Sequence, residues 1–150
     1  MNETLKHRGR DGHGLWIKDQ VALSHNRLAI LDKTHFSNQP MISRDENFIL
    51  IYNGELYNYK ELKAELEKKG KIFRSSGDTE VVLEALIEWG INAINKFNGM
   101  FALAFYDVKE KRLYLSRDRY GVKPLYFCAS EKSLVFASEE KAFRKLSFAN

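Results

Sequence analysis

The chain carries one short stretch whose residues could polarise an amide. Asn53 and Gly54 follow the apolar run 48–52. A glycine lets a backbone N–H approach a ligand closely, and the asparagine amide supplies a second donor. Two donors aimed at one point form an oxyanion hole for a tetrahedral acyl intermediate. The same pair after a strand is also typical of a hairpin turn, and spacing alone favours the turn.

Two further side chains could hold the charged ends of an amino acid. Asp78 lies in the segment 76–80, where helix capping by a serine or an aspartate is the simpler interpretation. Its carboxylate could instead hold an ammonium group. Arg27 is either a surface arginine or a bidentate partner for a carboxylate. An arginine and an acid beside an amide-polarising pair would suit glutamine, which carries all three groups.

Strands and helices together must position these residues. Runs of strands beside two consecutive helices indicate α+β layers rather than alternating βαβ units. The predicted elements are apolar stretches at 15–17, 21–23 and 28–31, a strand at 48–52, a helix between Asn58 and Gly70, a strand at 72–73, a helix at 79–89 ended by Gly90, two hairpins at 100–116 and 125–137, and a helix at 139–146.

Length and composition set the class of protein. A chain of 150 residues with 44% hydrophobic residues is sized for one domain with one core. One cysteine excludes an internal disulfide, and the histidines lack zinc-site spacing. No apolar run reaches the length of a membrane helix, and the first residues lack the apolar segment of a signal peptide. We therefore expect a cytoplasmic protein without a membrane partner.

The net charge of +4 could attract nucleic acid. Acidic and basic residues nevertheless interleave, most clearly over 60–69. This pattern is typical of a solvated helix face with ion pairs between successive turns. We therefore expect no nucleic-acid partner.

Eight motifs follow one another in a characteristic order, and several of them are long. This series resembles the class II glutamine amidotransferase domain of the asparagine synthetase family, and it covers essentially the whole chain. The motifs are HRGRD at 7–11, NRLAI at 26–30, QPM at 39–41, YNGELYN at 52–58, GDTE at 77–80, NGMFA at 98–102, RDRYGVKPLY at 117–126 and FASE at 136–139.

The resemblance implies an N-terminal-nucleophile hydrolase fold, a four-layer αββα sandwich of two antiparallel sheets between helices. It also implies roles for individual residues. Arg27 would hold the α-carboxylate of L-glutamine. Asp78, with help from Glu55, would hold the α-ammonium group. Asn53 and Gly54 would form the oxyanion hole, and this chain itself would need no cofactor and no metal.

In that family an N-terminal cysteine attacks the glutamine side chain. The released ammonia then passes to a synthetase domain or subunit, which uses ATP and Mg²⁺ to amidate aspartate or a related carboxylate. This chain begins with Met1 and Asn2 where the family has Cys-Gly and a strand, and it has Arg10 where the family has proline. We therefore expect residues 1–150 to be a type 2 glutamine amidotransferase domain that lacks its first strand and its synthetase domain, and that is inactive by itself.

Cys128 is not expected to replace that nucleophile, because a buried thiol in an apolar strand is inert. The alternative function is a nucleophile-free module that binds an amino acid, or that docks on a synthetase partner as a structural or regulatory subunit. A homodimer is a further partner that the resemblance leaves open.

Overall fold

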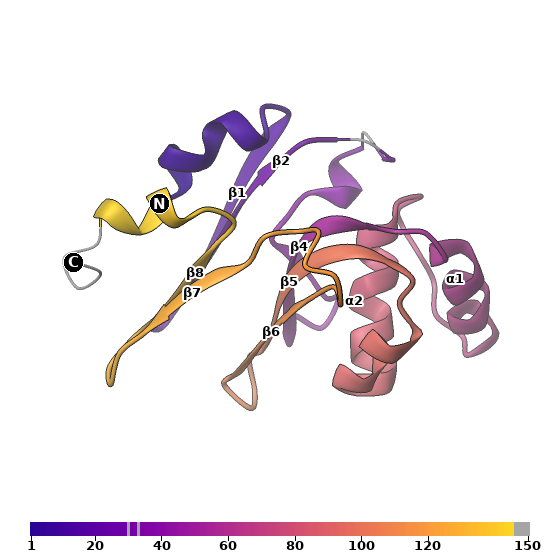
Figure 1. Cartoon of the computed structure of the whole chain (residues 1–150). Helices are drawn as coiled ribbons and strands as arrows, with labels where there is room; N and C mark the ends of the chain where they lie inside the picture. Colours follow the sequence, from indigo (N-terminus) through magenta and orange to yellow (C-terminus); the bar gives the residue numbers. More distant parts are fainter. Residues whose placement is uncertain (30, 33, 146–150) are drawn as a thin grey trace.

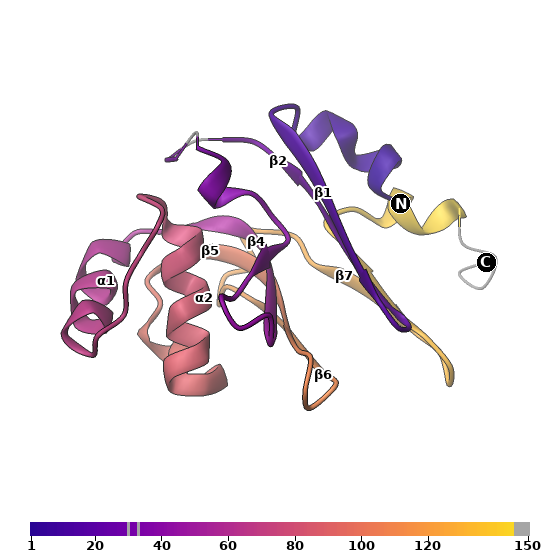
Figure 2. The same cartoon turned by 180° about the vertical axis from the view of Figure 1, so that it is seen from behind.

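The computed structural model describes residues 1–29, 31–32 and 34–145, which form layers of helix and sheet (Figures 1 and 2). This arrangement confirms the predicted α+β class. In chain order, with η for a 3-10 helix, the elements are η1 (Asn2–Arg8), β1 (Gly12–Lys18), β2 (Val21–Arg27), η2 (His35–Ser37), β3 (Met41–Ile42), β4 (Phe48–Leu56), α1 (Tyr59–Lys68), α2 (Asp78–Trp89), η3 (Gly90–Lys96), β5 (Gly99–Asp107), β6 (Arg112–Arg117), β7 (Tyr126–Ala129), β8 (Leu134–Ala137) and η4 (Glu140–Lys145).

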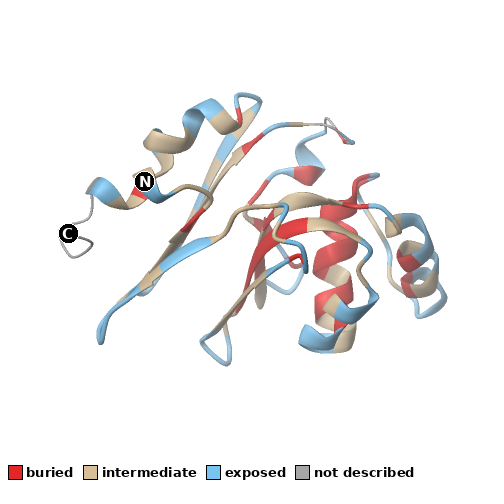
Figure 3. Cartoon of the chain, viewed as in Figure 1, coloured by how far each residue is buried: buried red, intermediate tan, exposed pale blue. Residues whose placement is uncertain are grey.

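The central sheet is antiparallel, with the strand order β3-β4-β5-β6. Helices α1 and α2 cover one of its faces (Figure 1). Because side chains alternate along a strand, every second residue of β4 and β5 points to these helices. Leu50, Tyr52 and Leu56 of β4 pack there with Val81 and Leu86 of α2. Buried residues accordingly concentrate in α2, β4 and β5 (Figure 3).

The other face of the central sheet is covered by two antiparallel ribbons, β1–β2 and β7–β8 (Figures 1 and 2). A smaller core of Leu23, Ile49 and Tyr106 lies between the layers, with Trp16 and Phe136 packed against it. The 3-10 helices η1 and η4 lie beyond the ribbons, close to the two chain ends. The predicted order of layers is therefore present, with two ribbons as the second sheet and short 3-10 helices as the outer helical layer.

Two predictions of local structure are wrong. Asn53 and Gly54 form no turn, because β4 continues through them to Leu56 and pairs with β5 along its whole length. No strand forms at 72–73, where Ile72 is 69% exposed and has no strand partner among the described residues. The last helix is of the 3-10 type. Residue 30 of the predicted apolar stretch and residue 146 of the predicted helix lie outside the described residues.

The predicted helix boundaries are confirmed, although the mechanism at Asn58 differs. Its side chain forms no cap at α1 but joins the helix start to the loop before β5. Its Oδ1 accepts the N–H of Asn98 at 3.0 Å and its Nδ2 donates to the carbonyl of Lys96 at 2.9 Å. Gly70 and Gly90 follow α1 and α2 with φ of 87° and 62°, which side chains disfavour. In the part of the chain described, no helix combines the length and apolar character needed to cross a membrane.

Candidate functional site

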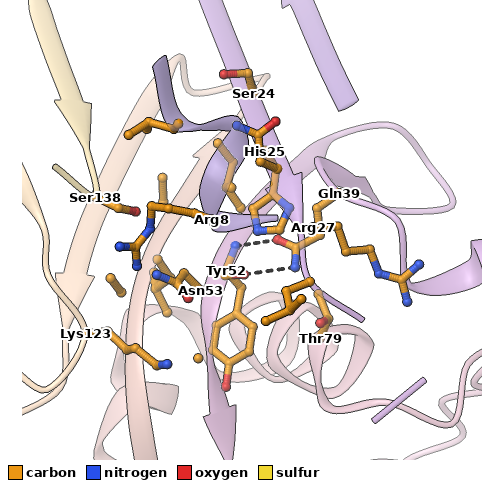
Figure 4. A pocket seen from close by; sticks show the side chains of 18 of the residues that line it. Arg8, Ser24, His25, Arg27, Gln39, Tyr52, Asn53, Thr79, Lys123 and Ser138 are labelled. Atoms are coloured by element: carbon orange, nitrogen blue, oxygen red, sulfur yellow. Dashed lines mark hydrogen bonds between the residues drawn. The ribbon is translucent and has the colours of Figure 1, made fainter. Parts of the chain in front are cut away.

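A cavity of about 310 Å³ lies between the central sheet and the ribbons, beside the start of α2 (Figure 4). Its lining comes from η1, β2 and the loop after it, β4, the first turn of α2, β5, the loop before β7, and β8. The five residues proposed from the sequence all line it: Arg27, Asn53, Gly54, Glu55 and Asp78.

The cavity exists because side-chain size changes along β4 and β5. On the face that meets the ribbons, Ile49 lies opposite Tyr106, and both pack with Leu23 to close the space between the layers. Four residues along β4, Asn53 lies opposite Ala102 on the same face. A short amide and a methyl group leave open the space that larger residues fill elsewhere. The Asn53 amide forms no hydrogen bond to any described residue, so it is free to donate to a ligand.

Gly54 is glycine because of its neighbours on β5. A Cβ atom at this position would lie 2.5 Å from the carbonyl oxygen of Met100 and 2.8 Å from Phe101 Cβ. It would also lie 2.8 Å from Cζ of Tyr52. The close approach of the strands, and not a positive φ, therefore requires glycine here.

Asp78 is buried at the first turn of α2, with 6% of its surface exposed. Its Oδ2 accepts the hydroxyl of Tyr52 at 3.0 Å and the N–H of Leu56 at 2.9 Å. Burial raises the pKa of Asp78, these hydrogen bonds oppose the rise in part, and nearby Glu55 adds to it. The N-cap is Gly77 and no side chain caps the helix, so the capping interpretation of this segment is wrong.

Arg27 ends β2 and is only 9% exposed, so it is not a surface arginine. Its guanidinium donates to the carbonyl of Thr34 and to Oδ1 of Asn38, both at 2.9 Å, and to the carbonyl of Asp32. In Figure 4 it points away from Asn53. The structure thus places Arg27 in the cavity lining with its head group engaged by the loop after β2.

Asp32 ties that loop to α2. Its carboxylate accepts the N–H of Thr34 at 2.7 Å and the N–H of Ser76 at 3.0 Å. Burial by itself would raise the pKa of Asp32, but the hydrogen bonds have the larger combined effect and lower it. The carboxylate therefore stays ionised. This link holds the segment that follows Arg27 against the turn that precedes Asp78.

The sequence analysis missed several polar residues of the cavity, among them His25, Gln39 and Lys123. Burial is the main cause that lowers the pKa of His25 to about 4. A hydrogen bond to the Tyr52 backbone raises the pKa in part, and the positive charge of Arg27 lowers it again. The imidazole is therefore neutral near pH 7, and its Nδ1 is buried without a hydrogen-bond partner among the described residues. Its spacing of two residues from Arg27 could have identified it, because alternate residues of a strand share a face.

Cys128 lies in β7 outside the cavity lining and is half-buried. The expectation of a buried thiol is wrong, because β7 pairs with β8 and with no other strand in the described part of the chain. Within the described residues, no three His, Cys, Asp or Glu side chains gather in a way that could hold a metal ion.

Comparison with known proteins points in one direction. The family model for a glutamine amidotransferase domain matches residues 1–150. The chain is 40% identical over 144 residues to asparagine synthetase [glutamine-hydrolyzing] 3 of Bacillus subtilis (strain 168), covering 95% of this chain and 23% of that protein. It is 39% identical over 142 residues to asparagine synthetase [glutamine-hydrolyzing] 1 of the same organism, covering 95% and 22%.

A solved structure gives the same picture of the fold. Glutamine phosphoribosylpyrophosphate amidotransferase from B. subtilis superposes with a TM-score of 0.68 at 29% identity, covering 81% of this chain and 28% of that one. This neighbour supports the N-terminal-nucleophile hydrolase type of fold. The chain spans roughly a quarter of the length of the relatives it matches.

Proposed function

The chain belongs to the glutamine amidotransferase domain family, and from that premise we propose that it binds L-glutamine in the cavity between the central sheet and the ribbons. The observation that carries the proposal is the convergence of its polar groups. Residues from β2, β4 and α2 that lie far apart in the sequence line one space large enough for a small ligand.

The charges of the lining match the two ends of a free amino acid. Arg27 keeps guanidinium N–H groups beyond those bound by the loop, and these receive the α-carboxylate. Asp78 and Glu55 receive the α-ammonium group. A cation beside Asp78 would counter the cost of burying its charge, so ligand binding and ionisation of this carboxylate favour each other.

The glutamine side chain then extends toward β4. The free amide of Asn53 and the backbone of Gly54 donate to the side-chain carbonyl oxygen, which gains negative charge when the amide carbon is attacked. The residues of the lining include no cysteine. We therefore assign these residues to binding and to stabilisation of the oxyanion, and assign no nucleophilic step to them.

In the whole protein, we propose that this domain supplies ammonia from glutamine to a synthetase domain that amidates aspartate or a related carboxylate. The names of the relatives and their fourfold greater length support this reading. ATP and Mg²⁺ would serve that other domain. Among the described residues, no three His, Cys, Asp or Glu side chains gather in a way that could hold a metal ion. A reducing cytoplasmic setting suits a chain with one cysteine.

Isothermal titration of the chain with L-glutamine tests the binding step. We expect saturable binding that Arg27→Ala abolishes, while D-glutamine, with its α-substituents exchanged, does not bind. The exposed Arg119→Ala variant is the matched control and should bind as the wild type does. Titrations that are flat with a folded wild-type chain would overturn the proposal.

A second measurement separates the two functions expected from the sequence. Glutamate release is assayed after a Cys-Gly-initiated strand is joined to the chain. Release that Asn53→Ala abolishes would support the amidotransferase. Binding without release in a folded product would instead favour the amino-acid-binding module.

A further inference from the structure

Gln39 makes an unusual pair of contacts with the strand that carries Asn53. Its side chain is buried, with 8% of the residue exposed. Its Oε1 accepts the backbone N–H of Tyr52 at 2.6 Å, and its Nε2 donates to the backbone carbonyl of Tyr52 at 2.9 Å (Figure 4). One side-chain amide therefore satisfies both backbone groups of one residue, as a neighbouring strand would.

The register of the sheet explains why a side chain, and not a strand backbone, pairs with Tyr52. Met41 and Ile42 of β3 pair with Leu50 and Ile49 of β4. Two more residues in the same register would bring the backbone of Gln39 opposite Tyr52. The ladder stops instead at Met41, the first residue of β3, so the backbone of Gln39 does not pair with that of Tyr52. The side chain of Gln39 then takes the place that the missing strand backbone leaves at Tyr52.

The chain makes room for this arrangement on the other side. A Cβ atom on Gly14 of β1 would lie 2.1 Å from the carbonyl oxygen of Gln39 and 3.0 Å from Cδ of Pro40. The ribbon therefore has a glycine where the backbone of Gln39 crosses it. Gln39 is held between β1 and β4, with little freedom to move away from Tyr52.

Tyr52 passes this constraint to both ends of the cavity. Its carbonyl shares a planar peptide unit with the N–H of Asn53, so fixing the carbonyl direction fixes that peptide. At its other end, the Tyr52 hydroxyl donates to Oδ2 of Asp78 at 3.0 Å. Tyr52, which Gln39 holds by two hydrogen bonds, thus contacts Asp78, the proposed ammonium-binding residue, and immediately precedes Asn53 and Gly54.

We propose that Gln39 is a positioning residue of the glutamine site, which sets the placement of Asn53, Gly54 and Asp78 through its two hydrogen bonds to Tyr52. This inference rests on the glutamine binding proposed above. It assigns a role to the QPM motif at 39–41, which the binding residues themselves do not explain. Gln39 reaches the ligand only through Tyr52 and is not itself a catalytic residue.

Variants of similar size separate the contributions of the two hydrogen bonds. Gln39→Glu keeps an acceptor for the Tyr52 N–H but loses the donor to its carbonyl. Gln39→Met loses both groups while it still fills the space. Gln20→Glu makes the same glutamine-to-glutamate change at the exposed turn between β1 and β2, away from Tyr52, and serves as the control. Gln20 and Gln39 are the only glutamines of the chain.

The first readout needs no ligand. Amide hydrogen exchange of the ligand-free chain should speed up at residues 52–56 by about tenfold or more in Gln39→Met, since a lost buried hydrogen bond changes an opening equilibrium by that order. Exchange in the hairpin between β5 and β6 should not change. Unchanged exchange at 52–56 in both Gln39 variants would overturn the inference, whether or not glutamine binds.

The second readout is the Kd for L-glutamine. Gln39→Met should weaken binding about tenfold, and Gln39→Glu should weaken it as well, because a carboxylate oxygen then faces the Tyr52 carbonyl, while Gln20→Glu binds normally. In the Asn53→Ala background, the effect of Gln39→Met should shrink, because one of the groups it positions is gone. Fully additive effects would indicate a general structural role and contradict the proposal.

The two readouts distinguish the failure of this inference from the failure of the proposed function. A wild-type chain that binds no glutamine, with faster exchange at 52–56 in the variants, removes the ligand but leaves Gln39 as the residue that positions Tyr52. If Gln39→Met does not fold, Gln39→Glu supplies both measurements.

Discussion

At the scale of single residues, the site combines ionisable groups that are costly to bury in their charged form with a polar group that would gain a hydrogen-bond partner only from a ligand. Asp78 is buried with a raised pKa, and His25 is half-buried and neutral near pH 7. The amide of Asn53 has no partner among the described residues. Buried ionisable groups and unpaired donors of this kind concentrate at functional sites, because a ligand can supply the charge or the hydrogen bond that they lack.

Asp78→Asn should separate binding from stability. An asparagine oxygen can still accept from Tyr52 and Leu56, while the cost of a buried charge disappears. We expect the free energy of unfolding at pH 7 to stay equal or to rise by up to about 2 kcal/mol. The Kd for L-glutamine should rise at least about tenfold, because the ammonium group loses its charged partner.

The pH dependence of this difference has a definite sign. Because the folded pKa of Asp78 is raised, its contribution to stability is full below the unfolded value of 3.8 and is lost as pH rises through the folded pKa. Any advantage of the variant should therefore shrink as pH falls toward 3.8. Denaturant unfolding at several pH values measures it, with Asp19→Asn at the exposed turn after β1 as control. A variant that is less stable than wild type at pH 7 contradicts the prediction.

His25 should make the chain sensitive to mild acid. Its pKa is lowered from 6.5 to about 4 in the folded state, so unfolding takes up a proton in this range. Stability is full above 6.5 and is lost as pH falls toward 4, by up to about 3 kcal/mol. The loss should be absent in His25→Gln and unchanged in the exposed His13→Gln. Equal acid sensitivity in all three chains, by denaturant unfolding, would rule His25 out as its cause.

At the scale of elements, the loop between β6 and β7 shows how a segment without regular structure becomes rigid. Asp118 is 6% exposed and accepts four backbone N–H groups, from Phe101, Tyr120, Val122 and Lys123, at 2.9 to 3.2 Å. Three of the donors lie in the loop and one in β5. The carboxylate therefore fixes the loop to the sheet and carries Lys123 to the cavity (Figure 4).

Asp118→Asn should loosen this loop. The amide NH₂ group would face backbone donors, and we expect a loss of about 2–3 kcal/mol in the free energy of unfolding. Hydrogen exchange at 118–123 should become faster. Asp107→Asn, at an exposed carboxylate that accepts a single N–H from Glu110, should cost less than about 1 kcal/mol. Equal costs in the two variants would show that the buried network adds nothing.

Acid should reduce the difference between Asp118→Asn and wild type. Burial would raise the pKa of Asp118, but the four N–H groups together lower it. The contribution of the carboxylate to stability is therefore present above its unfolded value of 3.8 and is lost as pH falls through the folded pKa.

At the scale of the whole molecule, a single acid joins the two ends of the described chain. Glu139 accepts His7 and Arg8 of η1 at 2.9 Å and pairs with Lys141 of η4 at 2.8 Å. Lys141 and Arg8, with a smaller effect from His7, lower the pKa of Glu139 to about 2 against the effect of burial. Charge pairing thus joins η1 to η4, and no residue of η1 is buried.

Glu139→Gln should therefore release the outer layer without unfolding the domain. We expect faster hydrogen exchange over residues 1–10 and 140–145, with a change in global unfolding free energy below about 1 kcal/mol. The contribution of the Glu139 carboxylate to stability is present above its unfolded pKa of 4.5 and is lost as pH falls toward its folded pKa of about 2. Glu131→Gln, at the exposed turn after β7, is the control. Slow exchange retained at both ends would contradict the prediction.

Much of the fold and the list of site residues followed from the sequence alone. Periodicity and glycine stops are local properties, so α1, α2 and the two hairpins lie where they were predicted, and the order of eight motifs identified the family and five residues that line one cavity. The hairpin turn that spacing alone favoured at Asn53 and Gly54 does not form, because pairing with β5 overrides the local preference.

Only the tertiary structure decided how these residues are held. The clamp of Gln39 on Tyr52, the loop around Arg27 and the neutral state of His25 depend on contacts between segments that are distant in the sequence. Burial and partner groups set hydrogen bonding and pKa, and neither is a property of a short stretch of residues. The sequence therefore identifies which residue types could act, whereas the burial and partner groups that set their hydrogen bonds and pKa values arise only when the layers pack.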